Sequence, residues 1–186
     1  MLTNRRREVV EEQEKIQAAK LIHEKARYYR GRFLNSVACI EHDSAHILTE
    51  YFCTSDPGKR KIFYSNIVTR AFFSLNRKKD ILMKIVQADY PLYWEEHREV
   101  LSAFQEILEF RNKLAHSRVD VSDEALDRPI KEGVGFTDWK DGRPITEEEF
   151  NDWKVKASMI SSCLTDIKHL LPFKQIKPNR KSGDPT

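Results

Sequence analysis

The sequence FRNKLAH, residues 110–116, ends a long segment in which apolar residues recur every three or four positions. The recurring residues are Val100, Leu101, Phe104, Ile107, Leu108 and Leu114. At about 100° per residue they lie on one arc, which is the pattern of an amphipathic helix packed on a core. The pattern therefore predicts a core helix from about Trp94 to His116.

Two polar residues of this stretch stand out. Arg111 projects from near the middle of the apolar arc, and a buried charge needs a partner or a water-filled cleft because desolvation is costly. His116 lies five residues further on, which is about 140° around an ideal helix. We expect the two side chains to converge on a groove at the helix end, since arginine is long and the last turn of a helix often unwinds.

The pattern Arg111-Asn112-x-x-x-His116 resembles the R-x4-6-H motif of the HEPN superfamily. The resemblance implies an all-helical domain, usually dimeric, whose active members are metal-independent endoribonucleases and often act as toxins or in defence. It implies that Arg111 and His116 are the catalytic pair and that Asn112 is the supporting polar position. Some toxin members carry a tyrosine two residues after the histidine, which a partner nucleotidyltransferase modifies. Arg118 stands at that position here, so control by that route is not expected.

The chemistry of these side chains agrees with the resemblance. Such cleavage needs a base for the 2′-hydroxyl proton, an acid for the leaving 5′-oxygen and positive charge on the phosphate. Histidine titrates near neutral pH, and the arginine fork fits a phosphate. One Arg–His pair offers a single proton-transfer group, so we expect a homodimer with a composite site. The alternative is a catalytically silent dimerisation or nucleotide- or RNA-binding module in which Arg111 is a structural anchor.

Composition fits one helical domain. The chain has 186 residues, 33% of them charged, and a net charge of +3 that is too small to indicate a nucleic-acid-binding surface by itself. Three scattered cysteines without a CxxC pair indicate reduced side chains. No apolar run is long enough for a membrane span and no signal peptide opens the chain, so we expect a cytoplasmic protein with no membrane partner.

We divide the chain into a charged N-terminal helix (1–30), a HEPN-like helical domain (31–173) and a basic flexible tail (174–186). Gly31 predicts a break or kink between the first two parts. Periodicity and turn residues predict further helices at 33–53, 59–75 and 80–90, a turn at 54–58 and a basic connection at 76–79. The basic residues at both ends, Arg5–Arg7 and 174–181, are either solvated termini or RNA contacts.

Glu41 falls within the apolar arc of the helix at 33–53. A carboxylate in that position needs a cation, and Arg111 is the obvious candidate. The spacing leaves a second interpretation open, in which Glu41 sits at the rim of the core and reaches water.

His42, His46 and Glu50 repeat at intervals of four on the opposite arc of the same helix. That spacing could hold a metal ion, although a solvated polar face is the favoured interpretation. We expect no metal and no cofactor in the site.

The pattern changes after the motif. Residues 129–142 predict a hairpin-like excursion with a turn at Asp141-Gly142. Thr146 and Glu149 form a capping-box sequence that begins a final helix to about Leu171. We therefore predict an all-α, HEPN-like helical bundle with a small β-hairpin-like insertion before the last helix. Its expected function is metal-independent RNA cleavage in a toxin–antitoxin or antiviral defence role, with an antitoxin or regulatory protein as a possible further partner.

Overall fold

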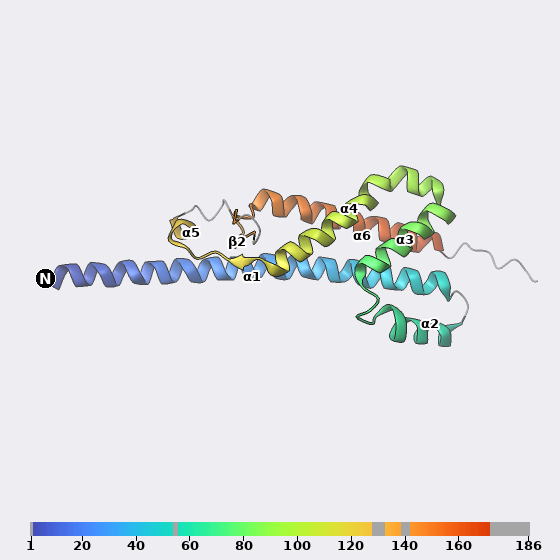
Figure 1. The fold of residues 1–186 in the computed structure, drawn as a ribbon, viewed down its shortest axis with the longest axis horizontal. Helices are drawn as coiled ribbons and strands as arrows, with labels where there is room; N and C mark the ends of the chain where they lie inside the picture. The colour runs from blue at the N-terminus through green and yellow to red at the C-terminus, as the bar shows by residue number, and fades with distance from the viewer. Residues whose placement is uncertain (1, 54–55, 128–132, 139–141, 172–186) are drawn as a thin grey trace, which may run out of the picture.

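The fold is described by a computed structural model that covers residues 2–53, 56–127, 133–138 and 142–171, with the backbone alone for residues 2–8. It is all-α apart from one two-stranded sheet (Figure 1). In chain order the elements are α1 (Leu2–Phe52), α2 (Pro57–Phe63), the π-helical turn η1 (Tyr64–Val68), α3 (Leu75–Asp89), α4 (Pro91–His116), β1 (Arg118–Val119), α5 (Asp123–Asp127), β2 (Phe136–Thr137) and α6 (Glu147–Leu170). The predicted tail at 174–186 lies outside the described residues.

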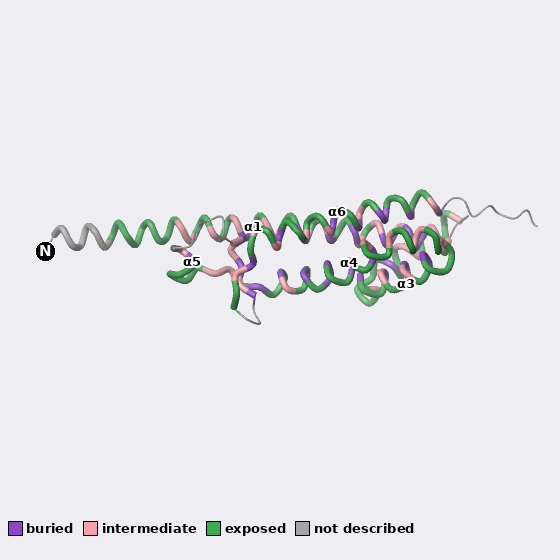
Figure 2. Tube along the Cα trace, turned by 90° about the horizontal axis from the view of Figure 1, so that it is seen from above, coloured by how far each residue is buried: buried purple, intermediate pink, exposed green. Residues whose placement is uncertain are grey.

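Helix α1 runs the length of the molecule, and its N-terminal part extends beyond the other elements (Figures 1 and 2). Its 51 residues correspond to about 76 Å at 1.5 Å per residue. The predicted break at Gly31 is wrong, because the helix continues through this exposed glycine. A single glycine costs a helix about 1 kcal/mol, and Ala26 and Phe33 are buried against the bundle on either side of it. Tertiary packing therefore holds the helix across Gly31.

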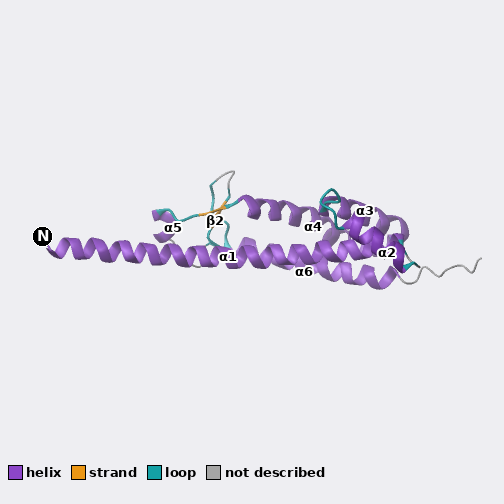
Figure 3. Cartoon of the chain, turned by 90° about the horizontal axis from the view of Figure 1, so that it is seen from below, coloured by secondary structure: helices purple, strands orange, loops and turns teal. Residues whose placement is uncertain are grey.

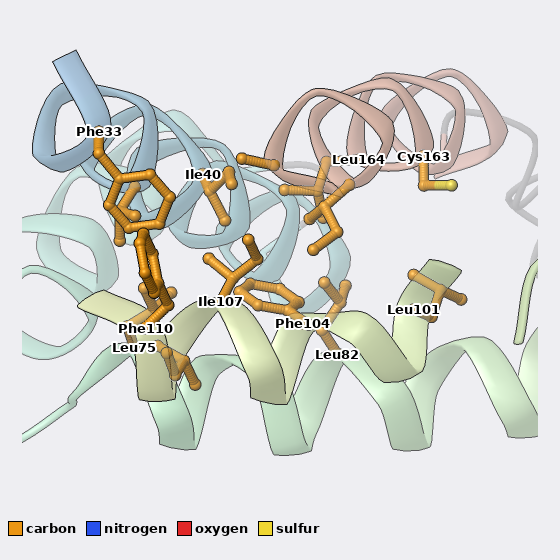
Figure 4. Close-up of a cluster of buried hydrophobic side chains, with 14 of the residues drawn as sticks. Phe33, Ile40, Leu75, Leu82, Leu101, Phe104, Ile107, Phe110, Cys163 and Leu164 are labelled. Carbon is orange, nitrogen blue, oxygen red and sulfur yellow. The ribbon is translucent and has the colours of Figure 1, made fainter. Parts of the chain in front are cut away.

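The core lies where α1, α3, α4 and α6 meet. Figure 4 shows Phe104, Ile107 and Phe110 of α4 lying beside Phe33 and Ile40 of α1. All five side chains are at most 2% exposed. Among the described residues, no helix has a stretch apolar enough to cross a membrane.

Aromatic rings fix the end of α4 against its neighbours. The Phe110 ring meets the Phe33 ring edge-on, with centroids 4.9 Å apart. The same ring stacks on Trp153 of α6 at 4.9 Å, and Phe150 approaches both phenylalanines. Such contacts add to the burial of large apolar surfaces, so they define the rotation of α4 about its axis.

The segment between α1 and α4 differs from the prediction. The expected helix at 59–75 divides into α2 and η1, and α3 begins at Leu75, so that it includes the whole of the expected basic connection at 76–79. Ser74 explains the early start, because its hydroxyl caps the helix by accepting from the Arg77 backbone amide. Two apolar residues of the expected helix at 59–75, Ile62 and Phe72, are each 61% exposed.

The described residues on the two sides of the predicted turn, 133–138 and 142–145, form the hairpin-like excursion (Figure 3). The Asp138 amide donates to the Arg143 carbonyl at 2.8 Å, and the Val134 amide donates to the Ile145 carbonyl at 3.0 Å. Strand β2 also pairs antiparallel with β1, directly after α4. Residues 129–132 and the turn residue Asp141 lie outside the description.

Gly135 lets this hairpin approach α1 closely. Its φ of +80° suits glycine, and a Cβ there would lie 3.0 Å from the Ile22 carbonyl oxygen and 3.1 Å from the Ala26 Cβ. Both distances are shorter than an ordinary Cβ contact. The hairpin can therefore lie this close to α1 only because residue 135 has no side chain.

A first prediction follows from this contact. Gly142→Ala should cost about 1 kcal/mol for its left-handed backbone alone, because φ is +71° and the space around it is open. Gly135→Ala should cost at least about 1 kcal/mol more, since it adds a clash with the backbone of α1. Urea unfolding followed by circular dichroism measures both. Equal losses would show that the close approach to α1 contributes nothing.

Candidate functional site

The last turn of α4 stays helical to His116. The Ser117 amide still donates to the Lys113 carbonyl at 2.9 Å, and the Arg30 guanidinium of α1 donates to the Ser117 carbonyl at 2.6 Å. Arg30 also lies over the Phe136 ring, 4.5 Å from its centroid. These contacts hold the helix end, so the expected unwinding does not occur and the predicted helix end at His116 is confirmed.

Arg111 is exposed, contrary to the expectation from the apolar arc. The arc turns at the helix end, where Phe110 and Leu114 take the inward positions. The Arg111 guanidinium donates to the side-chain oxygen of Asn112 at 3.0 Å. Its charge is therefore hydrated and carries no burial cost.

Arg111 and His116 open into two different hollows that adjoin along α4. The hollow at Arg111 has a volume of about 490 Å³ and is walled on its far side by Ser74 and Asn76, which flank the start of α3. The hollow at His116 has a volume of about 470 Å³ and lies between α4, the hairpin and α6. Asn112 borders both. The expected convergence of the two side chains on one groove is therefore wrong for a single chain.

A charged network lines the His116 hollow, and the sequence analysis missed it. The Lys113 ammonium lies 3.1 Å from the Asp138 carboxylate and 3.0 Å from that of Glu149. Arg143 lies 2.9 Å from the other Glu149 oxygen. Burial raises the pKa of Glu149, but the hydrogen bonds from Arg143 and Lys113 outweigh it and hold that pKa below its ordinary value. Glu149 therefore stays ionised beside His116 at neutral pH.

The capping-box prediction locates Glu149 correctly but gives only part of its role. Thr146 is the N-cap residue, and its hydroxyl accepts from the Glu149 amide at 3.1 Å. The Glu149 side chain turns to Lys113 and Arg143 instead of serving only the helix start. Lys113, inside the motif, was the feature of the sequence that could have indicated this network. It lies one turn before the end of α4 and points toward α6.

Glu41 has a different partner from the one predicted. Its carboxylate lies 2.5 Å from the Lys78 ammonium, and the side chains are 43% and 3% exposed. The predicted pairing with Arg111 is therefore wrong, although both residues border the same hollow. Glu41 occupies the rim of the core, as in the second interpretation, and neutralises a lysine that α3 buries.

The histidine pair on α1 forms a compact cluster. The two Nε2 atoms of His42 and His46 lie 3.1 Å apart, and the His46 ring packs on Tyr64 of η1 at 4.7 Å. Burial, followed by the neighbouring His42, lowers the pKa of His46. Within the described ranges, no group of three or more histidine, cysteine, aspartate or glutamate side chains is arranged to hold a metal ion.

Comparison with known proteins adds no relative from which a role could be transferred. No family model matches the chain, and searches of curated proteins and of solved structures find no match. The interpretation of the site therefore depends on its own geometry and chemistry.

The Glu41–Lys78 pair gives a second prediction. Glu41→Ala should lower the free energy of unfolding by about 1–3 kcal/mol, because it leaves a buried ammonium without its acceptor. Glu41→Gln keeps an acceptor and should cost less. Denaturant unfolding measures both changes.

The control for this prediction removes the stranded cation. Lys78→Met keeps an apolar stem of similar length, so the double variant with Glu41→Ala should recover most of the lost stability. A double variant no more stable than Glu41→Ala would contradict the proposed cause.

Proposed function

We propose that the protein is a metal-independent endoribonuclease of the HEPN type, acting in a toxin–antitoxin or antiviral defence role. The observation that carries the proposal is the end of α4, where Arg111 and His116 are both exposed and each borders a hollow. A cation whose fork fits a phosphate and an imidazole that can transfer protons are thereby accessible on one rigid helix. The match of these residues to the family motif supports the same chemistry.

The proposed reaction is an internal transesterification. His116 takes the proton of the ribose 2′-hydroxyl, whose oxygen attacks the adjacent phosphorus. The bond to the 5′-oxygen breaks, that oxygen gains a proton, and the product ends are a 2′,3′-cyclic phosphate and a 5′-hydroxyl. Arg111 stabilises the negative charge that builds on the phosphate, and Asn112 positions the guanidinium through their 3.0 Å hydrogen bond.

The two separate hollows favour a site shared between subunits. Arg111 and His116 of one chain border different spaces, whereas a two-fold contact at the ends of two α4 helices would place Arg111 of one subunit beside His116 of the other. The same contact would supply a second histidine, so that one acts as base and the other as acid. We therefore propose a homodimer with a composite site.

A catalytically silent module is the second candidate. The separation of Arg111 from His116 within one chain favours it, since each residue could then serve binding alone. Cleavage that depends on both residues separates the two candidates.

The cleavage prediction uses purified protein and mixed RNA in the presence of EDTA. His116→Ala should lower the rate about 10²- to 10⁴-fold through loss of proton transfer, and Arg111→Ala should also abolish most cleavage. Both side chains are exposed, so unfolding curves should change little. Products should carry 2′,3′-cyclic phosphate. Unchanged cleavage by the double variant, or 3′-hydroxyl ends, would refute the mechanism.

Subunit mixing tests the composite site. Arg111→Ala and His116→Ala proteins, each inactive alone, should regain a small part of the wild-type activity when they exchange subunits. The shared site then has one intact Arg111 and one intact His116 and lacks only the second histidine. Light scattering should give a dimer mass at micromolar concentration. No regain after demonstrated exchange, or a monomer mass in a preparation that cleaves RNA, would contradict the shared site without contradicting cleavage itself.

A further inference from the structure

Residues 57–79, which form α2, η1, the following loop and the first turns of α3, concentrate positive charge. They contain seven lysines and arginines and no aspartate or glutamate. The whole chain has a net charge of +3, so the remaining residues together carry −4 (3 minus 7). The small net charge thus conceals a strongly polarised molecule.

Some of these positive charges are exposed and can bind an anionic partner. Lys78 is buried against Glu41 and is neutralised there. Lys59, Lys61 and Arg70 are exposed, and the nearest ion pair of Lys59 is a loose one at 3.8 Å. Among the described residues, no carboxylate forms an ion pair with Lys61 or Arg70. These three cations are therefore available to an anionic partner.

The same segment exposes large apolar side chains. Ile62 and Phe72 are each 61% exposed, and Ile67 is 38% exposed. Phe52, at the end of α1, is 54% exposed and adjoins Phe63 with ring centroids 6.0 Å apart. Exposed aromatic and aliphatic groups interleaved with cations are the combination that binds unpaired bases and their phosphates.

The segment is continuous with the Arg111 hollow. The loop after η1 contributes Ala71 and Ser74 to the wall, and α3 contributes Asn76. Arg77 steadies this loop by donating to the Phe72 carbonyl at 3.2 Å. A chain of phosphates lying along the segment would therefore lead directly to the hollow that Arg111 borders.

We propose that α2, η1 and the loop to α3 form the docking surface for single-stranded RNA and direct it into the Arg111 hollow. This inference rests on the proposed ribonuclease function and specifies its substrate as unpaired RNA. Lys59, Lys61 and Arg70 bind phosphates, and Phe72 stacks on a base. Bases within a duplex are stacked and could not reach Phe72, so single strands are preferred.

An anionic membrane could also bind cations and apolar groups. The adjoining hollow presents Asn76, Gln105 and Asn112 beside Arg111, and these side chains offer hydrogen bonds to a nucleotide. RNA is therefore favoured.

Binding is measured separately from cleavage with a 2′-O-methyl RNA oligonucleotide, which lacks the attacking hydroxyl. The triple variant Lys59→Gln, Lys61→Gln, Arg70→Gln should bind about tenfold more weakly at low salt, and the slope of log affinity against log salt should become shallower by about 2. The matched control Lys20→Gln, Lys84→Gln, Lys154→Gln changes the same charge at exposed positions elsewhere. It should leave the slope nearly unchanged.

A second variant tests stacking. Phe72→Ala should weaken binding about tenfold with no change in salt slope, because it removes a base contact and no phosphate contact. Photocrosslinking of wild-type protein to the same oligonucleotide carrying 4-thiouridine should map to residues 57–79. This measurement does not depend on how the variants fold.

The outcomes separate this proposal from the ribonuclease. Equal binding by the triple variant and its control, crosslinks elsewhere, or binding to phosphatidylserine vesicles without binding to the oligonucleotide would overturn the docking surface. Arg111→Ala/His116→Ala protein should still bind the oligonucleotide. Binding at 57–79 without cleavage of ordinary RNA would refute the ribonuclease alone, whereas cleavage with unaltered binding by the variants would refute the docking surface alone.

Discussion

The packing of Phe110 determines where the chemistry-bearing side chains of α4 lie. Its ring is fixed between Phe33 and Trp153, both with centroids 4.9 Å away. With Phe110 inward, the rotation of about 100° per residue places Arg111 on one flank of the helix and His116 on the other. Turning α4 to bury the arginine would expose the phenyl ring and lose about 2–3 kcal/mol of burial. The division of the site into two hollows is thus a consequence of core packing.

Helix ends and caps could be predicted from the sequence, whereas the packing between helices and the partners of charged side chains could not. The end of α4 at His116 and the N-cap at Thr146 follow from periodicity and hydrogen-bonding groups within one turn of chain. The break predicted at Gly31 is wrong because the glycine costs the helix less free energy than the packing of α1 on either side contributes. One of the two interpretations of Glu41 paired it with Arg111, but the cation beside it is Lys78 of α3, a helix whose start was placed too late. Which cation reaches Glu41 therefore depends on where α3 begins.

The segment at 57–79 shows a different limit. Its apolar spacing predicted a helix at 59–75. Such spacing shows that side chains share one side of a helix and does not show what covers that side. Ile62 and Phe72 do not enter the core. The composition of the whole chain also hides this segment, because acidic residues elsewhere lower the net charge of the chain to +3. Its charge is visible only in a short window of sequence, because residues 57–79 contain seven lysines and arginines and no aspartate or glutamate.

Electrostatics gives a further reason why the proposed ribonuclease would need two chains. The His116 hollow contains the carboxylates of Asp138 and Glu149, which Lys113 and Arg143 only balance. The Arg111 hollow also contains carboxylates, those of Glu41 and Glu109, but Lys78 pairs with Glu41 and the basic segment adjoins the hollow. We therefore expect a phosphate to favour the Arg111 hollow. A single chain thus holds Arg111, the proposed phosphate ligand, apart from His116, the proposed proton-transfer group. In the proposed homodimer, a second α4 end would bring its own histidine to the arginine side and would leave the packing of Phe110 unchanged.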